Sequence, residues 1–340
     1  MTDGDAPTAA TDGSTTLANA SAAPTIDTSK LEKLQEHAAA FKFPQHWDAY
    51  LTSVTQPIFM RAALDPLGFD TAVRDATLYL ETRIRALCDA PQDMVGVDLM
   101  KHAFKPDPPR GLLSTPTVGA EAQGLFQMFY GSILQIRNPV GHRAVGTLAH
   151  RAFDTIAFVN YLLHIATECA TERFVYPFLP TRDRFRSVQA IKRVDIDGDG
   201  ADEFVVLVGE RDWTEQAGGE GRVLVLNKDC SASLPGDLRL MPGYLQGYVA
   251  IGDIDGDGHP EVVASLCDDN KLRHGLAITF DGTQIVELKV RGGGLLRTHT
   301  WPFEIVKPMS MAPDTAIIAY DDHNGVTHYR FDAGELVEEV

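Results

Sequence analysis

The chain of 340 residues has the length of two ordinary domains. Hydrophobic residues make up 44% of it and charged residues 23%, as is typical of a soluble globular protein. No apolar run reaches the roughly 18 to 20 residues that a bilayer span needs, so we expect no membrane partner. The net charge of −17 is concentrated in residues 181–340, which hold 16 basic and 28 acidic residues. A nucleic acid is therefore expected to bind only the middle of the chain.

Residues 1–29 have acidic residues where a secretion signal has basic ones, and they lack the apolar core of such a signal. We expect a disordered tail on a cytoplasmic protein. The cysteines are far apart and form no CxxC pair, which favours free thiols in a reducing compartment. They are Cys88, Cys169, Cys230 and Cys267.

Residues 30–175 are predicted to form a helical domain, because their apolar residues recur at helical spacing. We expect helices at residues 70–88, 97–104, 121–136 and 148–171. The last of these is apolar on most faces, which is typical of a helix in the middle of a bundle or at a dimer interface.

Residues 176–340 are predicted to form a β-rich domain, because short apolar runs alternate with Gly and Asp turns. The domain boundary is expected within residues 172–185, where Pro177 and Pro180 flank the change of period. The fold class is thus multidomain, with an α domain followed by an all-β domain. Strands are expected at residues 187–193, 204–208, 223–226, 248–251, 262–266, 277–280, 285–290 and 316–320.

Two nearly identical nonamers, DIDGDGADE at 195–203 and DIDGDGHPE at 253–261, each lie between two expected strands. Acids at positions 1, 3, 5 and 9 and glycines at positions 4 and 6 can converge hard oxygen ligands, which predicts a calcium site in each loop. An EF-hand is excluded, because Val206 and Ala264 occupy the position of its final glutamate. The alternative is a pair of solvated hairpin turns.

These loops resemble the calcium-binding turns of FG-GAP/VCBS repeats, which are the blades of integrin-type β-propellers. The resemblance implies side-chain ligands at positions 1, 3, 5 and 9 and a carbonyl ligand at position 7. In the first loop these are Asp195, Asp197, Asp199, Glu203 and the carbonyl of Ala201. In the second they are Asp253, Asp255, Asp257, Glu261 and the carbonyl of His259. Calcium in such an oxygen cage is expected to be structural, with no position open for catalysis.

The β domain departs from that family in the number of its blades. At the spacing of the two loops it accommodates fewer than three, whereas a closed propeller has about four to eight. Residues 319–329 resemble a degenerate third loop in which Asp321, Asp322 and Asn324 retain ligand character. We expect an open stack or sandwich, or a domain that completes itself by oligomerising.

The segment LFQMFYGSILQIRNPVGHR predicts an apolar helix that leads into Arg137 and His142. In a continuous helix, residues five apart point about 140° away from each other. Pro139 disfavours helical backbone at Asn138, and Gly141 permits an unusual turn, so the imidazole is expected to fold back beside the guanidinium. Such a pair suits phosphodiester cleavage, because arginine binds phosphate and histidine transfers protons near neutral pH. The alternative is that these side chains cap two helices and hold a turn.

This segment, with GVDLMKHAF at 96–104 and the helix AVRDATLYLETRIR before it, is similar to the HEPN-type domain of Ymh-like abortive-infection proteins. The resemblance covers about residues 45–167. It implies a metal-independent endoribonuclease with a defence or toxin-like role, whose active cleft combines residues of two subunits. His142 would then be the general acid or base, Arg137 the phosphate clamp and Asn138 the group that positions them.

The expected reaction is attack of a ribose 2′-hydroxyl on the adjacent phosphorus, which leaves a 2′,3′-cyclic phosphate and a 5′-hydroxyl. The expected partners are RNA and a second copy at the helical domain, and an unidentified protein or ligand at the acidic β domain. The alternative function is a non-catalytic dimeric scaffold whose calcium-bound β domain recognises a protein or glycan. Glu81 pairs with an arginine of its own helix or across the dimer interface, or is an exposed acid without a role.

Overall fold

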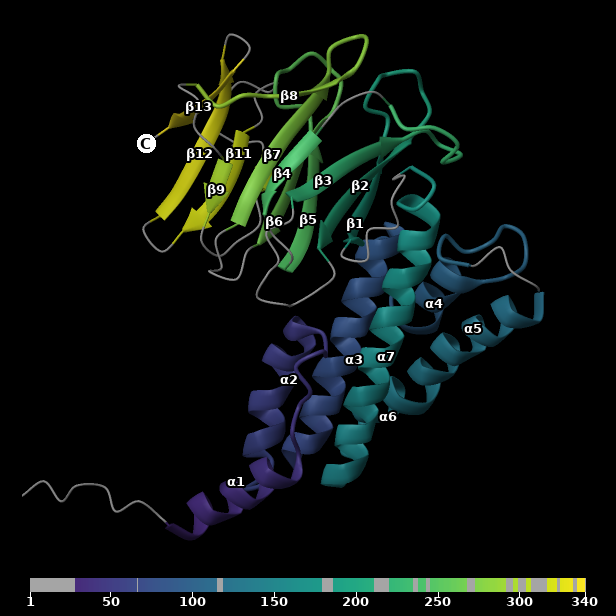
Figure 1. Cartoon of the computed structure of the whole chain (residues 1–340), viewed down its shortest axis with the longest axis vertical. Helices are drawn as coiled ribbons and strands as arrows, with labels where there is room; N and C mark the ends of the chain where they lie inside the picture. Colours follow the sequence, from purple (N-terminus) through teal and green to yellow (C-terminus); the bar gives the residue numbers. More distant parts are fainter. Residues whose placement is uncertain are drawn as a thin grey trace, which may run out of the picture.

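Helices fill the N-terminal half of the chain and antiparallel strands the C-terminal half, so the fold is mixed α+β (Figure 1). This agrees with the succession of helical and strand patterns in the sequence. The computed structural model describes residues 28–65, 67–114, 119–178, 186–210, 220–234, 238–242, 245–267, 273–291, 296–298, 304–306, 317–322, 325–332 and 335–339.

The four helices expected from the sequence correspond to α3, α4, α5 and α7, with ends shifted by a few residues. Two further helices, α1 and α2, precede them, and α1 begins inside the expected tail, of which residues 1–27 lie outside the described part. The helical segments are α1 (Thr28–Ala40), α2 (Ala49–Arg61), α3 (Leu67–Cys88), α4 (Gly96–Phe104), α5 (Gly119–Ser132), the π-helix η1 (Ile133–Arg137), α6 (Asn138–His142) and α7 (Ala149–Phe174).

Helices α3 and α7 lie side by side at the centre of the helical domain and run in the same direction (Figure 1). Their buried faces carry many small residues, among them Ala72 and Ala76 of α3 and Ala166 and Ala170 of α7. Small side chains let two helices approach closely, with larger apolar residues filling the spaces between the turns. This contact accounts for part of the apolar face of each helix, and α3 packs its other buried residues against α2 and β1.

Three antiparallel sheets make up the described part of the β domain. The first consists of β1 (Arg186–Val194), β2 (Glu203–Glu210), β3 (Glu220–Leu226) and β4 (Leu238–Pro242). The second consists of β5 (Leu245–Gly252), β6 (Glu261–Cys267), β7 (Arg273–Phe280), β8 (Ile285–Glu287) and β9 (Leu296–Thr298). The third consists of β10 (Glu304–Val306), β11 (Ile317–Asp322), β12 (Gly325–Asp332) and β13 (Glu335–Glu339).

The third sheet corrects two expectations from the sequence. The β domain has three sheets where the spacing of the nonamers predicted fewer than three blades, because β10–β13 form a sheet without such a loop. Asp321 and Asp322 lie in strand β11, whose residue 322 pairs with residue 325 of β12 in a tight hairpin, so the proposed third loop is wrong. Asn324 lies outside the described residues. Among the paired strands, none joins the third sheet to the first, so no closed ring is seen.

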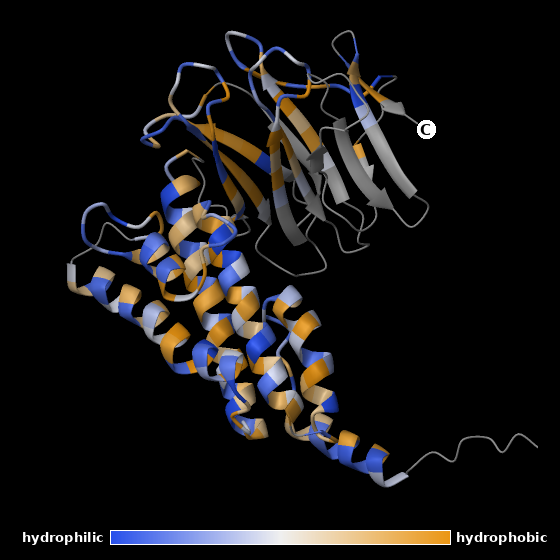
Figure 2. Cartoon of the chain, turned by 180° about the vertical axis from the view of Figure 1, so that it is seen from behind, coloured by the Kyte–Doolittle hydropathy of each residue, from blue (hydrophilic) through white to orange (hydrophobic). Residues whose placement is uncertain are grey.

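The first sheet is buried on both faces. Along β2, Val206 and Val208 face the helices, whereas Val205 and Leu207 face the second sheet, as the alternation of side chains in a strand requires. In Figure 2 the strands that lie next to the helices are mostly of hydrophobic colour. One continuous apolar core therefore joins the helical domain to the first sheet.

Polar side chains from the ends of α3 and α7 bind strand β1. Arg83 donates to the carbonyl oxygens of Val188, at 2.7 Å, and of Gln189. Asp89, just after α3, accepts from Lys192 Nζ at 3.0 Å and from the backbone N–H of Arg193 at 3.0 Å. Together with the shared core, these bonds fix the β domain to the C-terminal ends of both long helices.

None of the described helices combines the length and apolarity that crossing a bilayer requires. Cys88, Cys169 and Cys230 are free thiols, and burial raises the pKa of Cys88 and of Cys169 to about 12. The side chain of Cys267 lies outside the described part. Both shifted thiols stay protonated and unreactive at neutral pH.

Replacing Arg83 with alanine should destabilise the whole chain. The substitution leaves two carbonyl oxygens of β1 without their charged donor, which we expect to lower the free energy of unfolding by about 2 to 3 kcal/mol. Arg74→Ala is the matched control, because Arg74 lies on the same helix but is exposed and contacts only Asp75. Urea denaturation followed by circular dichroism compares the two, and equal effects would contradict this role of Arg83.

Candidate functional site

Arg137 lies at the end of η1 and forms an ion pair with Glu81 of α3. The Nε atom of Arg137 is 3.2 Å from Oε1 of Glu81, and the side chains are 21% and 3% exposed. The Glu81 carboxylate is thus buried, and the guanidinium covers it while keeping one edge towards solvent. The sequence-based expectation for Glu81 is wrong, since its arginine comes neither from its own helix nor from a second chain.

The chain passes Arg137 and Asn138 without the break predicted at Pro139. Asn138 has helical dihedral angles of φ −63° and ψ −46°, and its backbone N–H bonds the carbonyl of Ile133, five residues back. A π-turn of this kind inserts one extra residue per turn, and it lets a helix accommodate a proline. Pro139 was expected to disfavour helical backbone at Asn138, and that expectation of a break is wrong, because Asn138 is helical.

Gly141 also has a different role from the one expected. It lies within helix α6, and a Cβ atom at this position would be 3.5 Å from Nη1 of Arg137. The guanidinium of Arg137 thus lies against the backbone immediately before His142. His142 itself is exposed, and Asn138 is half-buried. The segment brings a half-buried, acid-paired arginine next to a turn that presents a histidine to solvent.

Asp70 holds the loop that leads from this segment into α7. Its carboxylate accepts the backbone N–H groups of Val145 at 2.7 Å, Gly146 at 2.9 Å and Thr147 at 2.9 Å. Partial burial raises the pKa of Asp70, but the hydrogen bonds from Thr147, Gly146 and Val145 outweigh that effect, so the pKa lies below its usual value. Asp70 lies in the first turn of α3, where an acid usually stabilises the start of its own helix. The sequence alone therefore does not reveal that it binds a distant loop.

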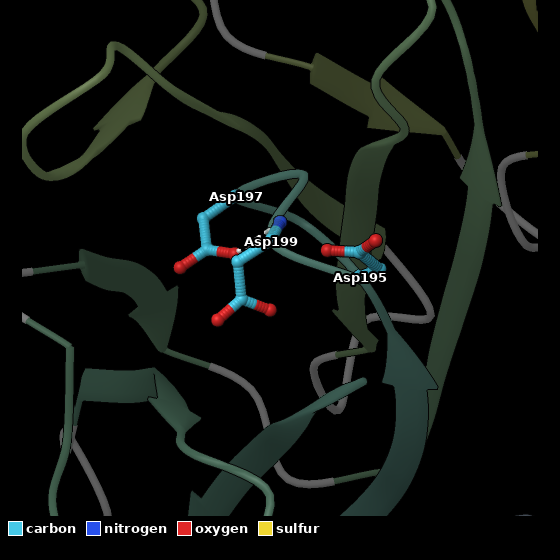
Figure 3. Close-up of side chains that lie close together, drawn as sticks. All are labelled: Asp195, Asp197 and Asp199. Carbon is cyan, nitrogen blue, oxygen red and sulfur yellow. Dashed lines mark hydrogen bonds between the residues drawn. The ribbon is translucent and has the colours of Figure 1, made fainter. Parts of the chain in front are cut away.

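The first nonamer gathers three carboxylates. In Figure 3, the side chain of Asp195 points towards those of Asp197 and Asp199, and one oxygen from each lies within 4.8 Å of the others. Gly198 and Gly200 have positive φ angles of 75° and 87°, which residues with a side chain rarely adopt. Oδ1 of Asp195 is buried without a hydrogen-bond partner in the described residues.

The second nonamer repeats this geometry with a different set of acids. Oxygens of Asp253, Asp255 and Glu261 lie within 4.8 Å of one another, and Gly256 and Gly258 have φ angles of 81° and 92°. Asp257 does not belong to this close group. Its Oδ1 atom accepts a hydrogen bond from the backbone N–H of His259 at 2.7 Å. Two loops distant in the sequence therefore share one backbone conformation.

The last acid of each nonamer is buried and holds its loop. Glu203 accepts the N–H of Ile196 at 3.1 Å, and Glu261 accepts the N–H of Ile254 at 2.6 Å and the hydroxyl of Thr279 at 3.0 Å. Burial, with a smaller contribution from the neighbouring aspartates, raises the pKa of each glutamate to about 7. Glu203 lies outside the close group of the first loop, whereas Glu261 belongs to that of the second.

The residues present fit a hard divalent cation. Carboxylates forced together repel one another, and a cation among them removes that repulsion and binds the unpaired oxygen of Asp195. The two loops also touch, because a Cβ atom on Gly198 would lie 2.2 Å from Cε1 of His259. The carbonyl oxygens of Ala201 and His259 belong to the same two turns, and neither is assigned as a ligand by the side-chain geometry.

Asp70→Asn should lower the stability of the chain in a pH-dependent way. Because the pKa of Asp70 is depressed on folding, its contribution is complete above about pH 4, the ordinary pKa of an aspartate, and is lost as the pH falls through the lowered value. We expect the variant to be less stable than the wild type by about 1 to 3 kcal/mol at pH 7 and by much less near pH 2. Denaturant titrations at both pH values measure this difference, and a pH-independent gap would contradict it.

A family model described as "Protein of unknown function (Hypoth_ymh)" matches residues 58–165. No curated protein and no solved structure matches the chain. The matched region runs from α2 into α7 and contains Asp70, Glu81, Arg137 and His142. The helical domain is therefore similar to the Ymh family, and the similarity includes every residue that holds or forms the arginine–histidine segment.

Proposed function

We propose that the helical domain is a metal-independent endoribonuclease of the HEPN type, acting in a defence or toxin-like role. The observation that carries this proposal is the position of the Arg137 guanidinium, which lies between buried Glu81 and the backbone of Gly141. The residue after Gly141 is the exposed His142. A permanently charged fork of fixed orientation suits the non-bridging oxygens of a phosphate. The imidazole of His142, exposed at the end of the following turn, suits proton transfer at neutral pH.

In the proposed reaction, His142 takes the proton of a ribose 2′-hydroxyl as the oxygen attacks the adjacent phosphorus. The bond from phosphorus to the 5′-oxygen breaks, and the protonated imidazole of His142 donates its proton to that oxygen. The products carry a 2′,3′-cyclic phosphate and a 5′-hydroxyl, and His142 returns to its neutral form. Arg137 stabilises the negative charge that develops on the phosphate oxygens. Glu81 fixes the direction of the guanidinium, and Asn138 is the polar group next to it.

A second copy of the chain is proposed to complete the cleft. Leu134 of η1 and Val145 and Leu148 of the loop before α7 are exposed apolar residues on either side of the Arg137–His142 segment. Burying such side chains against the same residues of a partner would favour a two-fold dimer. The two His142 side chains would then face a shared groove.

The rival function is a non-catalytic scaffold, and one observation favours it. Glu81 neutralises Arg137 within the chain, and a buried ion pair of this kind is also found where a residue only holds the fold. The two functions differ in what they require of His142, because the exposed imidazole has no structural contact among the described residues that a scaffold would need.

His142→Ala should abolish cleavage and leave the fold intact. Loss of a general acid or base lowers the rate by about 10²- to 10⁴-fold. The assay follows a fluorescent single-stranded RNA in EDTA, with mass spectrometry to identify the cyclic phosphate. His46→Ala is the matched control, since His46 is exposed and lies outside the segment. Equal residual activity in the wild type and His142→Ala would leave the scaffold function as the better account.

We further propose that the two nonamers hold calcium as FG-GAP-like structural sites. In the first loop the ion would bind Asp195, Asp197 and Asp199; in the second it would bind Asp253, Asp255 and Glu261. The unpaired Asp195 oxygen and the close carboxylates support this assignment. Bound calcium supplies charge compensation and loop rigidity, and cleavage is expected to continue without it.

Calcium should stabilise the wild type after EDTA treatment by about 2.7 kcal/mol for each of the two sites when present at about a hundred times its Kd. We expect Asp197→Asn and Asp255→Asn each to lose part of this gain, and the double variant to lose all of it. Asp98→Asn is the control, because Asp98 is exposed in α4 of the helical domain, where it pairs with Lys101 and belongs to neither nonamer. Thermal unfolding with and without calcium measures the effect, and a wild type indifferent to calcium would refute the assignment.

A further inference from the structure

Residues 122–153 contain no aspartate or glutamate, although 47 of the 340 residues of the chain are acidic. This acid-free stretch begins in α5 and ends in the first turns of α7. Its basic and histidine residues are Arg137, His142, Arg143, His150 and Arg151. A strongly acidic protein therefore carries one segment whose charge is entirely of the opposite sign.

The side chains of Arg143, His150 and Arg151 are exposed. Within the described residues, no carboxylate lies at ion-pair distance from either arginine, and Asp154, one turn after Arg151, does not pair with it. Asp70 lies beneath the loop between them, but its oxygens accept backbone N–H groups. The positive charge of this surface is thus directed at solvent.

The fold places these residues at one end of the helical domain. Helix α6 ends at His142, α7 begins at Ala149, and Asp70 binds the backbone of the loop between the two helices. Arg143 therefore lies beside His142, and the first turn of α7 follows directly across the loop. In Figure 1 the start of α7 lies at the end of the helix remote from the sheets.

The first turn of α7 has the wrong charge for helix stability. Helices α3, α4 and α5 each carry an acid in their first turn, whereas α7 has none, and its N-cap residue, Leu148, offers no side-chain hydrogen bond. The N-terminal end of a helix is electropositive, so His150 and Arg151 are unfavourable there unless an anion neutralises them. The helix end therefore adds to the positive potential of Arg143, His150 and Arg151, and it is the exposed arginines that define the surface.

We propose that Arg143, His150 and Arg151 bind the phosphate backbone of single-stranded RNA next to the bond that is cut. This inference rests on the proposed ribonuclease function and adds the surface that holds the substrate. Arginine forks bind phosphate oxygens irrespective of base, so the surface selects for a flexible polyanion and not for a sequence. Arg143 follows His142 in the chain, so its guanidinium would bind the phosphate next to the one that is cleaved.

The test uses the full chain with His142→Ala, which prevents cleavage, and adds Arg143→Ala and Arg151→Ala together. Binding of a fluorescein-labelled single-stranded RNA is followed by anisotropy over a series of salt concentrations. We expect affinity to fall about tenfold at low salt, and the slope of log K against log salt to decrease by about 1.4, or about 0.7 for each lost phosphate contact. Single-stranded DNA of the same sequence should show the same loss.

Two controls separate this surface from general charge and from folding. Arg110→Ala with Lys228→Ala removes two exposed charges elsewhere and should leave the slope unchanged. Arg143→Lys with Arg151→Lys keeps the charge and should restore most of the slope. An unchanged slope in the alanine variant, an equal loss in the Arg110 and Lys228 control, or an altered oligomeric state with unchanged RNA binding would each overturn the inference.

The outcomes also separate this inference from the proposed function. With catalytically intact His142, the two alanine substitutions should raise KM about tenfold and change kcat by less than about twofold, as expected for uniform binding. If the wild type does not cleave RNA but binds it through these arginines, the ribonuclease proposal fails and the binding surface stands. If the wild type cleaves RNA with unchanged KM in the arginine variant, the surface fails and the ribonuclease stands.

Discussion

Charged side chains of α3 bind the other parts of the molecule, since a buried or half-buried charge needs a hydrogen-bonding or ionic partner. Asp70 at its start binds the loop before α7, Glu81 in its middle pairs with Arg137, and Arg83 near its end and Asp89 just after it bind β1. Because these groups lie along one helix of 22 residues and the residue that follows it, the positions of the loop, the arginine and the strand are fixed relative to one another. The arginine–histidine segment and the β domain therefore belong to one rigid framework.

The first sheet shows why the calcium proposal is structural and not catalytic. Strand β1 is held by α3 along its length, and it runs directly into the first nonamer at Asp195. A cation there would offset the repulsion among Asp195, Asp197 and Asp199, and so would stabilise the end of the strand that α3 binds. Arg137 instead pairs with Glu81 in the middle of α3, in a different set of contacts.

The sequence predicts those parts of the fold that leave a local signature. The helices at residues 70–88 and 148–171 were predictable from their apolar period, and the positive φ angles of Gly198 and Gly256 from the spacing of the nonamers. Of the third sheet only β11 was expected, at residues 316–320, because backbone pairing requires no repeated motif. Glu81 did leave a local signature, as an acid adjoining Leu80 in an apolar stripe, but its partner lies 56 residues away and only the packing of α3 on η1 reveals it. The π-turn at Asn138 is likewise set by that packing and not by Pro139 alone.

The long helix α7 separates the acidic β domain from the arginines proposed to bind RNA. Helix α7 has 26 residues and spans about 39 Å at 1.5 Å per residue. Its C-terminal end contacts the β domain, where most of the negative charge lies, and its N-terminal end carries Arg151 (Figure 1). At physiological ionic strength the Debye length is about 8 Å, so repulsion from the β domain is screened over most of that distance. A polyanion approaching the start of α7 therefore experiences the local arginines and not the net charge of −17.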